Sequence, residues 1–284
     1  MEGFSVEKIT DIKQLKKKAI DIRRDILVML EKAGSGHTGG SLSIVEILVC
    51  LYYQRMNIDR ETCQRRERDK FVLSKGHACP ALYAVLADLG FFPREELWTL
   101  RKLGSSLQGH PQLGVPGIEI SSGSLGQGLS VSIGFALADR MDGVDARVYC
   151  LMGDGETNEG QVWEAAMTAA HYKINSLCGI VDFNRLQIDG PCCEVKDMGV
   201  YKKKWEAFGW YAIEADGHDF KELNKAFDKA DSIKDRPQIV IAHTTKGRGV
   251  SFVEDKVEWH GIAPKKDDLI KALAELDEQE KNLK

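Results

Sequence analysis

Two short polar motifs each follow a strongly apolar run, and their residue types suit a divalent cation and a diphosphate. Gly153-Asp154-Gly155 follows the run 148–152, and Asn184 follows the run 177–183. A carboxylate and an amide oxygen suit Mg²⁺, which takes its remaining oxygens from water and phosphates. The glycines let the backbone approach a ligand closely, and a helix beginning after them would present free N–H groups to an anion. We therefore predict that Asp154 and Asn184 hold a metal ion and, through it, a diphosphate.

The segments around these motifs are predicted to form a β-α-β unit. Both apolar runs are short and bounded by turn residues, as expected for strands buried on both faces. Residues 159–172 between them are rich in alanine and lack proline, which favours one helix. Crossover connections place such strands in parallel, with their carboxyl ends at one edge of the sheet. A Gly-Asp-Gly sequence alone also occurs in ordinary turns, so Asn184 at the next strand end makes the metal interpretation more specific.

The rest of the chain is predicted to extend the same α/β arrangement. Ser41 can cap a helix over 42–56. Apolar spacing and turn residues predict further helices over 9–30, 80–89, 126–141 and 267–284, and further strands over 70–74 and 239–242. We expect a single domain over residues 1–284, with a doubly wound, mostly parallel sheet and helices on both faces.

Four histidines lie in glycine-containing loops, where a rigid scaffold commonly places functional groups. They are His37, His77, His110 and His260. An imidazole can donate to a carbonyl oxygen, stabilise a developing alkoxide or move a proton near neutral pH. We therefore predict functional roles for all four. Of the other three histidines, His171 is expected to be structural and His218 to belong to a turn, and His243 is expected to support its loop, with contact to a cofactor as the alternative.

Composition argues against several other classes of protein, and the position of one glycine motif argues against a dinucleotide-binding site. The net charge of −4 favours neither nucleic acid nor an anionic membrane surface, and no apolar run approaches a membrane span. The seven cysteines are odd in number and include no Cys-x-x-Cys pair, which predicts reduced thiols in a cytoplasmic protein. Residues 34–39 spell the dinucleotide fingerprint Gly-x-Gly-x-x-Gly, but they follow a predicted helix rather than a strand, so we reject a nicotinamide or flavin site.

Taken together, the motifs resemble the cofactor-diphosphate half of transketolase, and the resemblance runs almost end to end. The supporting segments are 34–40, 74–77, 109–111, 123–128, 153–155 with Asn184, 216–219 and 259–261. Thr38 stands where the family commonly has proline, and Arg185 lies between the metal ligands where other residues are usual. The resemblance implies thiamine diphosphate and Mg²⁺ as cofactors and sugar phosphates as substrates, in the pentose phosphate pathway.

The resemblance also assigns residues to roles. It implies that Asp154, Asn184 and the carbonyl of Leu186 hold the metal, that His77, Gly155 and His260 contact the cofactor, and that Gly123, Ser124 and Leu125 lie near the aminopyrimidine ring of the cofactor. It also implies that His37, His110 and His260 act on the substrate and that Arg101 can face the sugar-phosphate tail. Glu159 and Glu164 would lie at a subunit interface.

The chain is shorter than a fused transketolase, which continues into two further domains. In that family a glutamate of the second domain activates the cofactor, and no segment here resembles that domain. We therefore expect a separate C-terminal subunit to supply it, in a heterotetramer with two copies of each chain. The expected reaction moves a two-carbon glycolaldehyde unit from a ketose phosphate to an aldose phosphate. Alternatives are a relative acting on a sulfonated or branched ketose, the α subunit of a 2-oxo acid dehydrogenase, and a non-catalytic thiamine diphosphate-binding paralogue.

Overall fold

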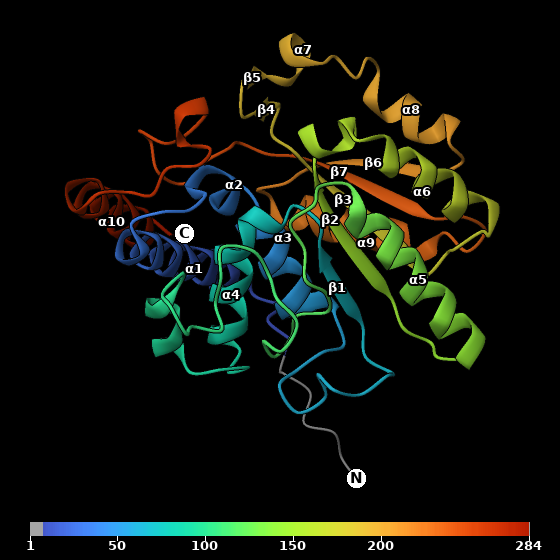
Figure 1. The fold of residues 1–284 in the computed structure, drawn as a ribbon, viewed down its shortest axis with the longest axis horizontal. Coiled ribbons are helices and arrows are strands. Elements are labelled where there is room, and N and C mark those ends of the chain that lie inside the picture. Colours follow the sequence, from blue (N-terminus) through green and yellow to red (C-terminus); the bar gives the residue numbers. More distant parts are fainter. Residues whose placement is uncertain (1–7, 284) are drawn as a thin grey trace.

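A parallel sheet forms the centre of the structure (Figure 1). The computed structural model describes residues 8–283. The five strands of this sheet lie in the order β1-β2-β3-β7-β6, and each adjacent pair is parallel. Their bounds are β1 Lys70–Leu73, β2 Val148–Gly153, β3 Leu177–Phe183, β6 Tyr211–Asp216 and β7 Gln238–His243. A separate antiparallel pair, β4 Leu186–Gln187 and β5 Gly190–Pro191, follows β3.

Helices cover both faces of the sheet, which confirms the predicted α/β fold (Figure 1). On one face lie α1 Ile12–Ala33, α3 Val45–Cys50, α4 Cys79–Asp88 and α9 Phe220–Ser232; on the other lie α5 Gln127–Asp142, α6 Gly160–His171 and α8 Tyr201–Ala207. The remaining α-helices are α2 Thr38–Leu42, α7 Cys192–Val195 and α10 Lys266–Lys281, and short 3-10 helices span Gly76–Ala78, Arg94–Thr99, Gly155–Asn158 and Val257–Trp259.

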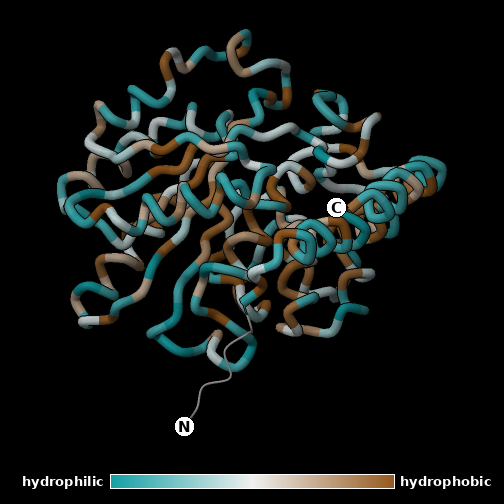
Figure 2. Tube along the Cα trace, turned by 180° about the vertical axis from the view of Figure 1, so that it is seen from behind, coloured by the Kyte–Doolittle hydropathy of each residue, from teal (hydrophilic) through white to brown (hydrophobic). Residues whose placement is uncertain are grey.

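Neighbouring residues of each central strand enter different apolar cores. Leu151 and Ile180 pack with the helices of the α1 face, whereas Cys150 and Val181 pack with those of the α5 face. β2 and β3 are buried along almost their whole length, as predicted for strands covered on both faces. The hydrophobic colour is concentrated in the interior, and α10 alternates between hydrophobic and hydrophilic residues (Figure 2).

The predicted β-α-β unit is present, and it aligns the two polar motifs. β2 and β3 are parallel, with Gly153 opposite Asp182, and α6 runs between them. The Asp154 amide donates to the Asp182 carbonyl at 3.2 Å. Asp154 and Asn184 therefore follow neighbouring strands at the same edge of the sheet.

The predicted helix over 42–56 is wrong in its extent, and so is the cap at Ser41. The segment begins as α2, turns, continues as α3 and ends in a π-helix, Leu51–Arg55. Ser41 lies inside α2, where its hydroxyl donates to the His37 carbonyl at 2.7 Å. The turn occurs because the Ser43 hydroxyl bonds to Asp182 at 2.7 Å, which holds the chain against the sheet edge.

Several elements of the C-terminal half differ from the predicted helices and strands. β6, α8 and α9 were not predicted. The N-cap of α9 is Asp219, whose carboxylate accepts the Lys221 amide at 2.7 Å. The last helix is α10, and Lys284 of the predicted range lies outside the described residues. The seven cysteines are free thiols, five of them buried. Within residues 8–283, no helix combines the length and apolar character that a membrane crossing requires.

Candidate active site

A cavity of about 430 Å³ opens at the carboxyl ends of the central strands. It is within the usual range for small-molecule sites, roughly 300–1,000 Å³. Ten of the twelve predicted site residues line it: His37, His77, His110, Gly123, Leu125, Asp154, Gly155, Asn184, Leu186 and His260. Ser124 and Arg101 are not among its lining residues. Segments distant in the sequence therefore converge on one space, as the parallel sheet requires.

The four predicted histidines form one cluster. The His37 ring centroid lies 5.0 Å from that of His77, 5.7 Å from His260 and 6.4 Å from His110. His77 and His260 are 5.4 Å apart. Each comes from a different loop, so only the folded chain brings them together.

The histidines of this cluster are held neutral. Burial, followed by the positive charge of Arg101, lowers the pKa of His37 to about 4. Burial and then Lys246 lower the pKa of His260 to about 3. Burial also lowers the pKa values of His77 and His110. Neutral imidazoles can both donate and accept hydrogen bonds. The buried Nδ1 of His37 has no protein partner among the described residues, so it remains free for a ligand.

Arg101 does not line the cavity, but it lies close enough to the histidine cluster for its charge to add to the effect of burial and lower the pKa values of His37 and His110. Its backbone is in the left-handed region, with φ of 60°, and its guanidinium donates to the Ser35 hydroxyl at 3.3 Å. A Cβ added to Gly109 would come within 2.5 Å of that guanidinium, so a larger residue there would displace the Arg101 side chain. The buried Arg101 Nε also has no partner among residues 8–283. Its contact with a sugar phosphate stays a prediction.

The residues predicted to hold a metal fit a hard cation. Asp154 accepts the amides of Gly155 and Arg185. Burial, and then the neighbouring Asp182 carboxylate, raise the pKa of Asp154 to about 6, so a nearby cation would stabilise its charged form. The Asn184 amide nitrogen donates to Asp182 at 2.8 Å, and its oxygen accepts the Leu186 amide at 3.1 Å, which leaves the second lone pair of that oxygen for a metal. These two residues could hold Mg²⁺.

A buried lysine that the sequence analysis did not single out supports binding of an anion. Lys246 is only 2% exposed, and its ammonium donates to the Leu186 carbonyl at 3.1 Å and lies 2.7 Å from His260 Nδ1. Burial, and then the charge of Lys75, lower the pKa of Lys246 to about 8. Both contacts are neutral groups, so a diphosphate in the cavity would compensate this buried charge. The Leu186 carbonyl, the third predicted metal ligand, would then share its lone pairs with Lys246.

Two buried carboxylates, also unrecognised in the sequence, hold the loops of the site in place. Asp182 accepts hydrogen bonds from Lys75 and Asn184 on its fully buried side chain. Glu156 accepts the amides of Gly126 at 2.8 Å and Gly153 at 3.0 Å, and the hydroxyl of Ser74. Asn184 and Gly153 are local partners, but Lys75, Ser74 and Gly126 are 107, 82 and 30 residues away from the carboxylates they contact, so no local pattern could reveal the full roles. For Lys75, one local feature indicated a place near the site: its position between the predicted strand 70–74 and His77.

The residues expected outside the site are placed as follows. His171 is exposed at the end of α6, and His243 bonds to Glu214 and Arg185 on the surface. His218 lies in the predicted turn, but it also joins a buried hydrogen-bond network through both ring nitrogens. Glu159 lines the cavity and Glu164 is exposed on α6; whether they meet another subunit stays a prediction.

Comparison with known proteins gives a consistent family. Residues 15–280 match the family model "Transketolase, thiamine diphosphate binding domain". The chain is 42% identical to one subunit of the "Apulose-4-phosphate transketolase" of Phocaeicola vulgatus, covering 90% of this chain and 92% of that protein. It is also 42% identical to "6-deoxy-6-sulfo-D-fructose transketolase subunit SqwG" of Clostridium sp. (strain MSTE9), covering 91% and 94%.

Longer transketolases match over part of their length. The transketolase of Pongo abelii is 44% identical, with 92% of this chain and 42% of that protein covered. The crystal structure of Campylobacter jejuni transketolase superimposes with a TM-score of 0.89 at 32% identity, covering 94% of this chain and 43% of that one. The chain thus spans less than half of these two relatives but nearly all of the two shorter ones. It therefore belongs to the transketolase family of transferases and carries that family's thiamine diphosphate-binding domain.

Proposed function

We propose that this chain is the N-terminal subunit of a two-chain, thiamine diphosphate- and Mg²⁺-dependent ketol transferase. The enzyme would move a glycolaldehyde unit from a ketose phosphate to an aldose phosphate. Asp154, Asn184 and the Leu186 carbonyl would hold the metal, and Lys246 would face the diphosphate. The observation that carries the proposal is the convergence of four neutral histidines with these groups on one cavity.

The histidines can serve the proton transfers that this reaction requires. The donor ketose loses the bond between C2 and C3, its C3 hydroxyl gives up a proton, and the acceptor's carbonyl oxygen gains one. When bound, thiamine diphosphate supplies the group that carries the two-carbon unit between the sugars. His37 has a free buried Nδ1, and the Lys246 contact leaves Nε2 of His260 as that ring's other nitrogen. We assign His37, His110 and His260 to the substrate hydroxyl and carbonyl groups.

A separate subunit would complete the site. Two relatives that match over nearly their full length are named as subunits of transketolases, which implies a partner chain in those enzymes. The partner would supply the glutamate that activates the cofactor, and two copies of each chain would form a heterotetramer.

The names of these two relatives favour an unusual ketose as the alternative donor. One protein is named for apulose 4-phosphate and the other for 6-deoxy-6-sulfo-D-fructose. Both match this chain at 42% identity, close to the 44% of the longer Pongo abelii transketolase, so the identities do not separate the donors. Xylulose 5-phosphate, a branched ketose phosphate and a sulfonated ketose therefore form the donor panel.

The deciding experiment assays the chain alone and with its separately encoded C-terminal subunit. With Mg²⁺ and thiamine diphosphate, the pair should transfer the ketol unit from one donor of the panel at about 1 s⁻¹ or faster, while the chain alone should not. In the complex, His260→Ala should lower kcat/KM by roughly 10²-fold, the scale of a lost acid–base group. The control His171→Ala should leave it unchanged. Turnover by the lone chain would contradict the split site, and a complex that binds cofactor without any ketol transfer would identify a non-catalytic binder.

A further inference from the structure

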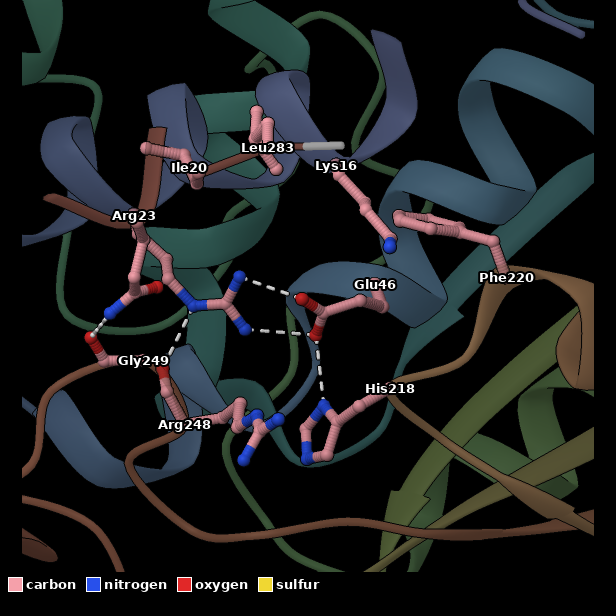
Figure 3. Close-up of a pocket in the computed structure, with 10 residues that line it drawn as sticks. Lys16, Ile20, Arg23, Glu46, His218, Phe220, Arg248, Gly249 and Leu283 are labelled. Atoms are coloured by element: carbon pink, nitrogen blue, oxygen red, sulfur yellow. Dashed lines mark hydrogen bonds and ion pairs between the residues drawn. The ribbon is translucent and has the colours of Figure 1, made fainter. Parts of the chain in front are cut away.

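A second cavity, of about 200 Å³, lies apart from the candidate active site and shares no lining residue with it (Figure 3). Its walls come from α1, α3, the start of α9, the loop after β7 and the end of α10. The lining residues are Lys16, Ile20, Arg23, Glu46, His218, Phe220, Arg248, Gly249, Gln279 and Leu283. Nothing in the proposed ketol transfer uses this space.

The inner wall of this cavity is a rigid and electrically balanced network. Arg23 donates two hydrogen bonds to Glu46, at 2.7 and 2.9 Å, and a third to the Arg248 carbonyl at 2.8 Å. His218 Nε2 accepts the Thr245 amide at 2.8 Å, so its Nδ1 carries the proton that it donates to Glu46 at 2.9 Å. Burial opposes ionisation of Glu46, but Arg23 and then His218 outweigh it and lower its pKa to about 2. The network therefore leaves no net charge to attract a ligand.

Two further cations line the same space. In Figure 3, Lys16 and Arg248 lie on opposite sides of the Arg23–Glu46 pair, and both side chains extend into the cavity. Within residues 8–283, neither side chain has a hydrogen-bond partner. The Arg248 guanidinium forms an ion pair with the Glu254 carboxylate at 3.6 Å, a distance beyond hydrogen-bond length. Within the described residues, the cavity therefore combines a neutral floor with the unpaired ammonium of Lys16 and with a guanidinium whose N–H groups are still free to donate.

The remaining wall is apolar and limits what can bind. Ile20, Phe220 and Leu283 line the side nearest α1 and α9. The Arg248 fork suits the oxygens of a phosphate group, and the Lys16 ammonium adds a second positive charge on the other side of the Arg23–Glu46 pair. The small volume leaves room for a compact body attached to that group, which would rest on the apolar wall. We propose that this cavity is a binding site for a small phosphate-bearing anion.

The position of the site gives it access to the candidate active site. The Thr245 amide donates to His218, and Arg248 lines the second cavity. Between them, Lys246 lines the cofactor cavity. The intervening Gly247 donates to the carbonyl of Gly39 at 3.0 Å. A phosphate held by Arg248 would thus contact the short loop that places Lys246 beside His260.

Residue-specific chemical protection tests the proposal on the chain as purified, because phosphate can also enter the cofactor cavity. The chain is treated with an acylating reagent for lysine and phenylglyoxal for arginine, with and without inorganic phosphate, and modified peptides are quantified by mass spectrometry. At about 10 mM phosphate, ten times a Kd of about 1 mM, modification of Lys16 and Arg248 should slow at least threefold. Lys17 and Arg236 are solvent-exposed cations that do not line the cavity, and they are the internal controls.

Matched variants complete the test. Arg248→Gln should abolish protection of Lys16, whereas Arg236→Gln should preserve it. Glycerol phosphate identifies the source of the anion: protection at lower concentration than inorganic phosphate indicates a phosphate ester, and equal protection indicates the free ion. Unchanged modification of Lys16 and Arg248, or equal protection of Lys17 and Arg236, would overturn the proposal.

Discussion

Replacing Asp182 by asparagine should destabilise the protein strongly while preserving the shape of the side chain. The carboxylate is fully buried and accepts hydrogen bonds from Ser43, Lys75, Asn184 and Thr244. An amide can keep some of these bonds, but it removes the negative charge opposite the Lys75 ammonium, which is 2% exposed. Breaking one side of a buried ion pair costs about 3–5 kcal/mol. That loss is a large part of a typical unfolding free energy of about 5–15 kcal/mol.

The measurement is urea unfolding followed by far-UV circular dichroism, with the slope m compared between variants. A shift of the midpoint at unchanged m reports a change in the free energy of unfolding. The double variant Lys75→Met/Asp182→Asn removes both charges and should recover about 2 kcal/mol or more of the loss, because the two sites are directly coupled. Asp235→Asn removes one partner of a solvent-exposed pair with Arg236 and should leave the midpoint unchanged.

The pH dependence has a defined sign. Burial would raise the pKa of Asp182, but Lys75 outweighs it and the pKa in the folded state is lowered. The stabilising contribution should therefore be complete above the unfolded-state pKa of about 4 and decline as the pH falls below it. A loss smaller than about 1 kcal/mol at pH 7, well below the cost of a broken buried pair, would refute the reasoning, as would a double variant no more stable than the single one.

Two further predictions concern stability. Glu46→Gln should reduce the loss of stability at acid pH. The pKa of Glu46 falls from 4.5 to about 2 on folding, so the free energy of unfolding of the wild type should decrease by about 3 kcal/mol as the pH falls through that range. Urea midpoints measured at each pH should show a smaller decrease in the variant. Gly128→Ala should cost about 1–3 kcal/mol by overpacking, because the added Cβ would lie 2.4 Å from Ser74 Cβ. The matched change Gly134→Ala, in the same helix with open space around it, should instead stabilise by about 0.5–1 kcal/mol; thermal melting distinguishes the two signs.

The β-α-β unit could be predicted because its signals are local. The apolar runs that became β2 and β3 are continuous, and the polar residue after each run marks the carboxyl end of a strand. Parallel pairing then requires Asp154 and Asn184 to meet at one edge, wherever the other strands lie. The histidine loops were found in the same way, because each histidine lies beside a glycine.

The missed features depend on contacts between distant segments. β7 lies between β3 and β6, an order that no strand's own sequence encodes. The helix predicted over 42–56 is interrupted where Ser43 bonds to Asp182, which is 139 residues away in the chain. Lys75 and Lys246 carry a charge that usually indicates the surface, and only the folded structure shows both to be buried.

Asp154 and Lys246, two buried charged groups that line the cavity, have complementary requirements. Asp154 is a buried carboxylate with a raised pKa, so it would be stabilised by a cation. Lys246 is a buried ammonium with a lowered pKa, so it would be stabilised by an anion. Within the described residues they form no hydrogen bond with each other, and each contacts neutral groups instead. A metal ion bound to a diphosphate carries both signs of charge in one ligand, so it could satisfy the two sites together where a phosphate or a metal ion alone would satisfy only one.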